Sequence, residues 1–397
     1  MKKLLLLASV FAAGAVSAQS IVSTSVEDRN VILEEYTGKT CGWCPAGHKI
    51  AADFAKDNQG DVVLINIHTG SFASGTPNYR MEFPDSTDYG QAIVRHPDVR
   101  VTGYPSGTVN RRKFGGSQTA ALSRNAWVSS SNTILGETSP VNVAVESMYD
   151  PINSRVFIKV EAYYTSDANA SSNYLNVGIL QNNIWGPQSG SSRYPENVDN
   201  SRPSWSATDP NSGKYKHMHM LRDVLTGQWG EELTETSFGS FHVKTYVWDV
   251  PEDINDIAVD PLELEAYAFV TESQMNIESG SVATVRAARG EIDMTMALTQ
   301  NTFNLVGVDD VEEADEVTKV YPNPATENVF VKVNDRNISD VSINVYTATG
   351  QKVAASSKEQ LNENTVKLDV SNFIDGFYFV EVVDGASVLS RETIIKR

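Results

Sequence analysis

The pattern of apolar and polar positions divides the chain into segments of different texture. Between residues 21 and 137, short apolar runs alternate with stretches of helical period. We predict strands over 30–36, 61–68 and 106–111, and helices over 41–56, 89–95 and 118–134. Strands and helices in alternation are typical of an α/β domain, which we assign to residues 19–137.

The texture changes after residue 137. Alternating apolar positions recur between turn-rich spacers, which predicts an antiparallel β-sandwich domain over residues 138–303. An acidic run over 304–318 is expected to be a solvated linker. Residues 319–397 contain further strand-like runs at 329–333, 341–346, 365–368 and 377–383, with a hairpin signal at Asp384-Gly385. The expected fold class is therefore multidomain, α/β plus all-β.

The first 18 residues predict export. Lys2 and Lys3 precede an apolar stretch over 4–16 and a small-residue cleavage motif at 16–18, as in a signal peptide. The stretch is shorter than the roughly 20 residues of a membrane-spanning helix, and we expect no transmembrane segment in the mature chain. The formal net charge of −18 argues against nucleic acid as a partner, because phosphate binding requires clustered Lys and Arg.

The sequence contains two cysteines, Cys41 and Cys44. A disulfide between residues so close in sequence closes a small loop and removes little entropy from the unfolded chain, so it is poorly explained as a stabiliser. Redox chemistry, metal binding and chance remain. Redox chemistry is favoured, because a helix start stabilises a thiolate and a second Cys one turn later can resolve a mixed disulfide.

Histidines offer alternative sites. His48 and the two cysteines could supply three metal ligands, but no fourth is suggested, and structural zinc requires four. His68 ends a predicted buried strand, where a hydrogen-bonded role is commoner than substrate binding. His217 and His219 share a face if that segment is extended, and we expect a surface pair there. No metal and no cofactor are predicted.

A resemblance to a known superfamily sharpens this picture. Residues 35–45 are EYTGKTCGWCP, and Tyr104-Pro105 follows the second predicted strand. This combination resembles the thioredoxin-like superfamily, which implies a thioredoxin-like fold for residues 19–137. The resemblance implies catalytic roles for Cys41, Cys44 and Glu35, a Cys41–Cys44 disulfide, and contacts to a substrate chain from Trp43, Tyr104 and a cis Pro105.

The resemblance leaves two points open. Glu34 competes with Glu35 for the role of the buried acid that relays protons to Cys44. Trp43 departs from the Gly-Pro pair that thioredoxin has between its cysteines, so the reduction potential is not predicted, because these residues tune it.

A narrower resemblance covers roughly residues 27–290. The runs LEEYTG at 33–38 and VNR at 109–111, followed by the predicted sandwich, are similar to the outer-membrane-protein twenty-eight-kilodalton family of Bacteroidota. That family is regarded as surface or adhesin-like. A second hypothesis is therefore a surface binding or adhesion protein on a redox-inactive thioredoxin-like scaffold.

The last eighty residues carry a third resemblance. The runs VYPNPA at 320–325, VYTATGQKV at 345–353 and GFY at 376–378, with a terminal Lys396-Arg397, are similar to the type A C-terminal sorting domain of type IX secretion. This implies transport through the periplasm and outer membrane by the type IX machinery. The function we expect is a secreted or cell-surface thiol–disulfide oxidoreductase that acts on protein disulfides.

Overall fold

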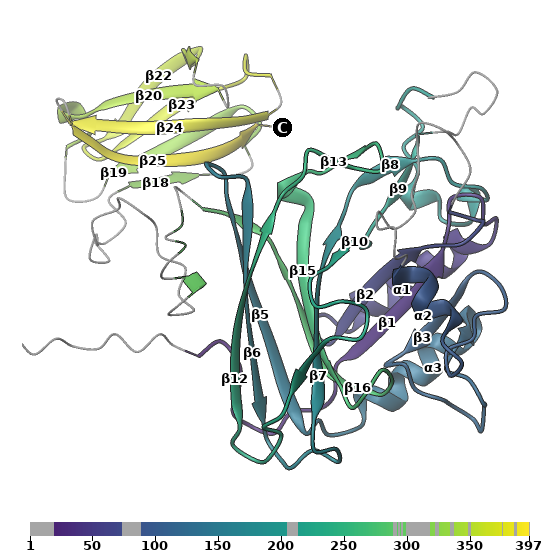
Figure 1. Cartoon of the computed structure of the whole chain (residues 1–397). Coiled ribbons are helices and arrows are strands. Elements are labelled where there is room, and N and C mark those ends of the chain that lie inside the picture. The colour runs from purple at the N-terminus through teal and green to yellow at the C-terminus, as the bar shows by residue number, and fades with distance from the viewer. Residues whose placement is uncertain are drawn as a thin grey trace, which may run out of the picture. The chain divides into compact units, whose positions relative to one another are not determined.

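The chain is described by a computed structural model that covers residues 20–73, 89–204 and 213–288, the single residues 292, 294, 297 and 298, and residues 318–396 with short gaps at 322–324, 334–336, 348–350, 375 and 385–386. It divides into two compact units, Met1–Gly307 and Val308–Arg397 (Figure 1). The predicted signal peptide, almost all of the predicted linker, and residues 322–324 of the VYPNPA run lie outside the described residues. No described helix is both long and apolar enough to cross a membrane.

A long mixed sheet runs through the first unit. In spatial order its strands are β16, β15, β7, β10, β2, β1, β3 and β4, and β11 pairs with β7. Their bounds are β1 Val31–Thr37, β2 Val62–His68, β3 Ser106–Val109, β4 Leu122–Ser123, β7 Asn173–Gln181, β10 Met220–Val224, β11 Glu231–Leu233, β15 Leu264–Thr271 and β16 Ile277–Thr284. Strands of the predicted α/β domain and of the predicted sandwich thus share one sheet, joined where Asn66 of β2 meets Met220 of β10. The domain boundary at residue 137 stays a prediction.

Helices cover both faces of this sheet around β1. Helices α1 (Cys44–Asp57) and α3 (Arg124–Leu135) lie on one face, where Leu33, Phe54 and Trp127 share a core. The short α2 (Tyr89–Arg95) contributes Ile93 to a core on the opposite face. The predicted helix over 118–134 begins too early, because Leu122 is already engaged in strand pairing with β3.

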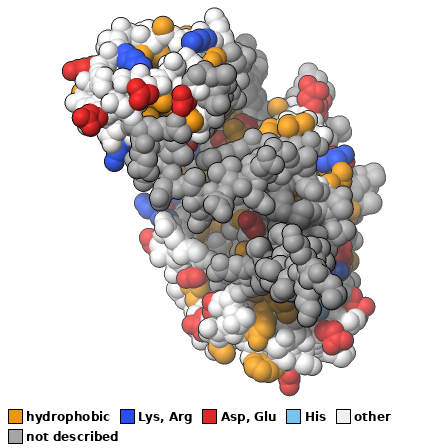
Figure 2. Space-filling view, turned by 90° about the vertical axis from the view of Figure 1, so that its left-hand side faces the viewer, with side chains coloured by type: hydrophobic (Ala, Val, Ile, Leu, Met, Phe, Trp, Pro, Cys, Tyr) orange, Lys and Arg blue, Asp and Glu red, His pale blue; other side chains and the backbone are white. Residues whose placement is uncertain are grey.

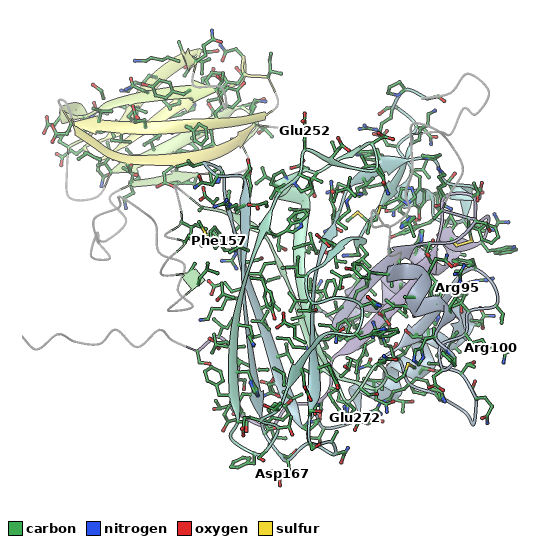
Figure 3. All side chains as sticks on the ribbon, in the orientation of Figure 1. Arg95, Arg100, Phe157, Asp167, Glu252 and Glu272 are labelled. Atoms are coloured by element: carbon green, nitrogen blue, oxygen red, sulfur yellow. A yellow bond between two sulfur atoms is a disulfide. The ribbon has the colours of Figure 1, made fainter. Side chains whose placement is uncertain are left out.

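The predicted sandwich is completed by a second sheet. It contains β12 (Phe241–Asp249), β6 (Arg155–Tyr164) and β5 (Val141–Asp150), which are antiparallel, and β17 (Arg286–Ala287), which is parallel to β5. Apolar side chains of β5 and β6 pack against those of β7 and β15. Side chains fill the space between the layers, and Glu252 and Asp167 mark opposite ends of the sandwich (Figure 3). The remaining pairs are β8 (Ile184–Gly186) with β9 (Tyr215–His217) and β13 (Asp253–Ile254) with β14 (Ile257–Ala258).

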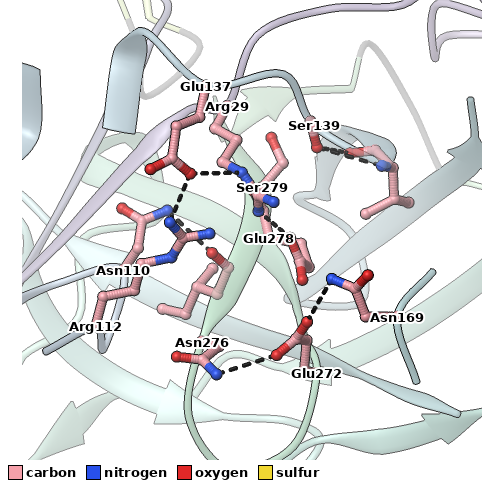
Figure 4. A network of polar contacts seen from close by, with 12 residues as sticks. Arg29, Asn110, Arg112, Glu137, Ser139, Asn169, Glu272, Asn276, Glu278 and Ser279 are labelled. Carbon is pink, nitrogen blue, oxygen red and sulfur yellow. Dashed lines mark hydrogen bonds and ion pairs between the residues drawn. The ribbon is translucent and has the colours of Figure 1, made fainter. Parts of the chain in front are cut away.

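A polar network joins the start of β1 to β16 (Figure 4). Arg29 forms ion pairs with Glu278 of β16 and, at 3.3 Å, with Glu137. Glu137 also pairs with Arg112 at 2.5 Å. The side-chain amide of Asn110 bonds main-chain atoms of both β1 and β16. Because buried polar groups are costly unless they are satisfied, this network holds the two strands in one relative position.

A second buried ion pair lies on the α2 face of β1. The guanidinium of Arg111 binds both carboxylate oxygens of Glu34, Nη2 to Oε1 at 2.6 Å and Nε to Oε2 at 2.8 Å. Thr108 donates a further hydrogen bond to Glu34. Both charged side chains are only 2% exposed. Removing one partner of such a pair leaves a buried, uncompensated charge.

The second unit is a small β-sandwich. Among its described residues, one sheet has the order β18-β19-β23-β22 and the other β21-β20-β24-β25. Their bounds are β18 Thr318–Tyr321, β19 Asn328–Val333, β20 Ser342–Thr347, β21 Lys352–Val353, β22 Ser357–Asn362, β23 Thr365–Asp369, β24 Gly376–Asp384 and β25 Ser387–Lys396. The four predicted strands are present, and their ends differ from the prediction by one residue at most. On the face shown in Figure 2, the charged side chains that are described stand among uncharged ones, as on a solvated surface.

We predict that Arg111→Met lowers the free energy of unfolding by about 3–5 kcal/mol, because Glu34 is left charged and buried. Urea unfolding of the mature chain measures the loss. Lys113→Met is the matched control: its ion pair with Asp98 is about half exposed, so the loss should stay below about 1 kcal/mol. Equal losses in the two variants would contradict the assignment.

Candidate functional site

The two cysteines form a disulfide at the amino end of α1. The sulfur atoms are 2.12 Å apart and the Cα atoms 5.4 Å apart, so the expected Cys41–Cys44 disulfide is confirmed. Cys44 is the first residue of α1, and Cys41 lies in the turn that precedes it. The predicted helix start at Cys41 is therefore wrong by three residues. Cys41 is 2% exposed and Cys44 is fully buried.

Glu35 lies on the face of β1 that packs against α1, next to Gly47. Side chains alternate along β1, so Glu34 and Glu35 point to opposite faces of the sheet. Glu34 meets Arg111, whereas Oε1 of Glu35 lies 2.6 Å from the position that a Cβ of Gly47 would take. Gly47 follows Cys44 by three positions, and residues three apart share one face of a helix. Glu35 thus faces the side of α1 that bears Cys44, and Glu34 is engaged elsewhere.

The Glu35 carboxyl group has no hydrogen-bond partner among the described residues. It is 1% exposed, and burial raises its pKa well above the usual value for a glutamate. The neutral, protonated form is therefore favoured. The nearest basic group is the His48 imidazole, whose Nε2 lies 3.7 Å from Oε1.

His48 lies between Glu35 and a small cavity. Its Nε2 shares a hydrogen bond with Thr37 Oγ1 at 2.9 Å, and its Nδ1 shares one with Tyr215 Oη at 2.7 Å. Burial lowers the pKa of His48 to about 3, so the imidazole is neutral at physiological pH. A cavity of about 170 Å³ adjoins it and is lined in part by Tyr194.

A second histidine contact lies nearby. His68 Nε2 and His217 Nδ1 are 3.3 Å apart, and His217 Nε2 lies 3.3 Å from the carbonyl oxygen of Pro187. Burial lowers the pKa of His68 to about 3 and that of His217 well below its usual value. The expected surface pair of His217 and His219 is wrong. The chain turns at His219, with φ of 50°, and directs that ring to Glu265 while His217 is buried.

The alternative metal site is not formed. Both cysteines are engaged in the disulfide, and His48 is bonded to Thr37 and Tyr215. Across the described part of the chain, no three His, Cys, Asp or Glu side chains are arranged to hold a metal ion.

Tyr104 is linked through Phe72 to Thr40, the residue before Cys41. The peptide bond between Tyr104 and Pro105 is cis, as expected. The next residue, Ser106, pairs with Tyr36 near the end of β1. The Tyr104 ring packs on Phe72 at 5.3 Å between centroids, and the Phe72 carbonyl accepts a hydrogen bond from the main-chain N–H of Thr40 at 3.0 Å. A cavity of about 610 Å³ borders Tyr104 and Pro105.

Trp43 is the exposed member of the motif. Its side chain is 54% exposed. The guanidinium of Arg193 lies 4.1 Å from the centre of its ring and that of Arg124 lies 4.9 Å from it, which is within range of a cation–π interaction. Sequence reasoning missed Arg193, because it is far from the motif in sequence and no periodic pattern marks it.

Two family models match the chain. Residues 96–291 match the model of outer membrane protein Omp28. The central region is similar to the Omp28 family. Residues 319–396 match the model of the secretion system C-terminal sorting domain. The chain is therefore exported to the cell surface or secreted, and its sorting domain implies the type IX machinery as a partner.

Two solved structures resemble this chain to different degrees. HBP35 of Porphyromonas gingivalis is 16% identical, with a TM-score of 0.50, over 93% of this chain and 98% of that chain. A domain of the outer membrane lipoprotein Omp28 of Porphyromonas gingivalis is 14% identical, with a TM-score of 0.24, over 38% of this chain and 90% of that domain. No curated protein sequence matches this chain.

We predict that acid destabilises the first unit through its buried histidines. His48, His68 and His217 stay neutral when folded but bind protons in the unfolded chain below about pH 6.5. Each should lower the free energy of unfolding by about 1.4 kcal/mol per pH unit as the pH falls below that value. Glu35 acts in the opposite direction: its raised pKa means that the folded state takes up its proton at higher pH than the unfolded chain does.

The prediction is tested by urea unfolding of the mature chain and of His48→Gln between pH 7 and pH 4.5. The variant should lose stability less steeply as the pH falls, by up to about 1.4 kcal/mol per pH unit. Parallel curves for the two proteins would show that His48 does not contribute.

Proposed function

We propose that this chain is an exported thiol–disulfide oxidoreductase that acts on protein disulfides through Cys41 and Cys44. The observation that carries the proposal is the arrangement around α1: a disulfide at its amino end and a buried, unpaired acid, Glu35, behind the same helix face. A disulfide of this loop size contributes little stability, so a chemical role explains the pair better than a structural one.

The N-terminal strands and helices support a thioredoxin-like scaffold for this site. β1, α1 and β2 follow one another with β1 and β2 parallel, and β3 then runs antiparallel to β1 after the cis Tyr104–Pro105 bond. Helix α3 returns to the face that carries α1. In this scaffold the carboxyl ends of β1 and β2, the disulfide loop and the cis-proline loop lie together.

The exchange reaction follows from these positions. In the reduced protein, the Cys41 thiolate attacks one sulfur of a protein disulfide, forms a mixed disulfide and releases the first substrate thiolate. Cys44 then attacks the Cys41 sulfur, releases the second substrate thiolate and leaves the disulfide described here. The substrate gains two electrons and the cysteine pair loses two. The same reaction in the reverse direction oxidises a substrate dithiol and reduces the cysteine pair.

Glu35 supplies the proton transfer in this scheme. Resolution requires Cys44 as a thiolate, so its proton must move to a base. Because its pKa is raised, the Glu35 carboxyl group holds a proton that it can give to the first departing substrate thiolate. The carboxylate that is left can then take the proton of Cys44. Trp43 lies between the two cysteines and is exposed, and we expect it to contact the substrate chain together with Tyr104 and Pro105.

A second candidate function is binding or adhesion at the cell surface on a redox-inactive scaffold. One observation favours it: Cys41, the sulfur that must meet a substrate, is only 2% exposed. Membership of the Omp28 family and export to the surface fit both candidates equally well.

We predict that the reduced mature chain reduces insulin disulfides with dithiothreitol as the electron source. Cys41→Ser should abolish turnover, because the attacking sulfur is lost. Cys44→Ser should accumulate a mixed disulfide through Cys41, visible by mass spectrometry as an adduct that dithiothreitol removes. Turnover that survives in Cys41→Ser, or its absence from the wild-type chain at every pH tested, would exclude the oxidoreductase.

We predict that Glu35→Gln slows insulin reduction by about 10- to 100-fold near neutral pH, in the range expected for loss of a general acid–base group. The loss should shrink as the pH rises and Cys44 ionises without help. Asp53→Asn, which removes an exposed carboxylate from the same helix, is the control and should leave the rate and its pH profile unchanged. A pH-independent loss in Glu35→Gln would assign Glu35 a purely structural role.

A further inference from the structure

A short segment from a distant part of the chain lies against the disulfide loop. It comprises Gln188–Arg193, which we name the strap, and it leaves β8 directly after Pro187. The strap is separated from Cys41 by more than 140 positions in sequence. It reaches the site because β10, which follows β9, pairs with β2 in the shared sheet.

Hydrogen bonds fasten the strap to the disulfide loop. The main-chain N–H of Ser189 donates to the carbonyl oxygen of Lys39 at 2.8 Å. The Gln188 side-chain amide donates to the carbonyl oxygens of Cys41 at 3.0 Å and of Gly38 at 3.3 Å. Gln188 is itself buried, so these bonds are shielded from water.

The closest approach is made by a glycine. Gly190 has φ of 70°, and a Cβ at this position would lie 2.0 Å from the carbonyl oxygen of Gly42. No side chain fits there while the strap is in place. The strap then ends at Arg193, whose guanidinium lies over the ring of Trp43. The strap therefore contacts the loop from Gly38 to Trp43 along its whole length.

The base of the strap is held as well. His217 Nε2 lies 3.3 Å from the Pro187 carbonyl oxygen. β8, which ends just before the strap, is paired with β9. The strap itself is a turn and a single 3₁₀ turn (Ser191–Arg193), with little secondary structure of its own. A segment of this kind can open locally at a smaller cost than the strands that hold its base.

We propose that the strap controls access to the Cys41–Cys44 disulfide: closed, as described here, it shields the pair from thiols, and exchange requires its displacement. The shielding is independent of any activity, whereas the view that it regulates turnover rests on the proposed function. It accounts for a chemically competent disulfide whose first sulfur is buried.

The test is the rate at which dithiothreitol reduces the disulfide of the oxidised mature chain, followed by acid quenching, maleimide labelling and intact mass. In this reaction one dithiothreitol thiolate breaks the S–S bond and forms a mixed disulfide. That first attack frees one cysteine as a thiolate; the second dithiothreitol thiol then closes the cyclic disulfide and frees the other.

Gly190→Ala should raise the second-order rate constant about tenfold or more, because the added Cβ excludes the closed position. Gly227→Ala is the matched control. Gly227 has φ of 71° but nothing within 4 Å of its Cβ position, so the same backbone strain arises without a clash. Its rate should stay within about twofold of wild type. Arg111→Met, which lowers global stability away from the strap, should likewise not accelerate reduction.

If the folded Gly190→Ala protein is reduced at the wild-type rate, the proposal that the strap controls access to the disulfide is wrong. If that variant does not unfold cooperatively, Gln188→Ala decides instead: a rise of about threefold or more supports the strap, and an unchanged rate overturns it. Insulin turnover separates the two proposals. If dithiothreitol reduces the Gly190→Ala variant faster than wild type, but neither protein turns over insulin, the proposal for the strap is supported and the proposed oxidoreductase activity is excluded.

Discussion

The first unit must accommodate two consecutive carboxyl groups on one fully buried strand. Every residue of β1 is buried, and side chains alternate across it, so Glu34 and Glu35 enter two different cores. Glu34 is compensated by a bidentate contact with Arg111. Glu35 has no hydrogen-bond partner among the described residues, and burial favours its neutral form. One strand therefore carries both a buried ion pair and a neutral carboxyl group that faces α1.

The shared sheet explains how distant segments reach the site. β10 continues the sheet beyond β2, and the strap, which follows β8, contacts the loop that precedes α1. Tyr215 and His217 of β9 then bond to His48 and His68. The strands after residue 137 thus supply side chains that bond to His48 of α1 and to His68 of β2.

The sequence predicted what local pattern and short spacing encode. The strands of the second unit, the disulfide and the cis Pro105 all follow from residues close together in sequence or from a compact motif. The choice between Glu34 and Glu35 could not be made, because it depends on which face of β1 receives α1.

Contacts between distant residues were beyond prediction. β2 and β10 are joined by one residue pair, and nothing in either segment announces it. His217 was expected at the surface, since its burial depends on His68, which lies 149 positions earlier. The strap has no periodicity, and its role rests on the absence of a Cβ at Gly190. The start of α1 was placed three residues early because a turn and a helix begin with the same local pattern.

The central claim is that Cys41 and Cys44 form a reversible redox couple and not a static crosslink. The most direct test is the reduction potential of the pair in the mature chain, obtained by equilibration with dithiothreitol and glutathione buffers and measured by alkylation and intact mass. The account predicts reversible equilibration between about −120 and −270 mV, the range spanned by thiol–disulfide oxidoreductases. A disulfide that stays oxidised until below about −300 mV, as structural disulfides do, would contradict it.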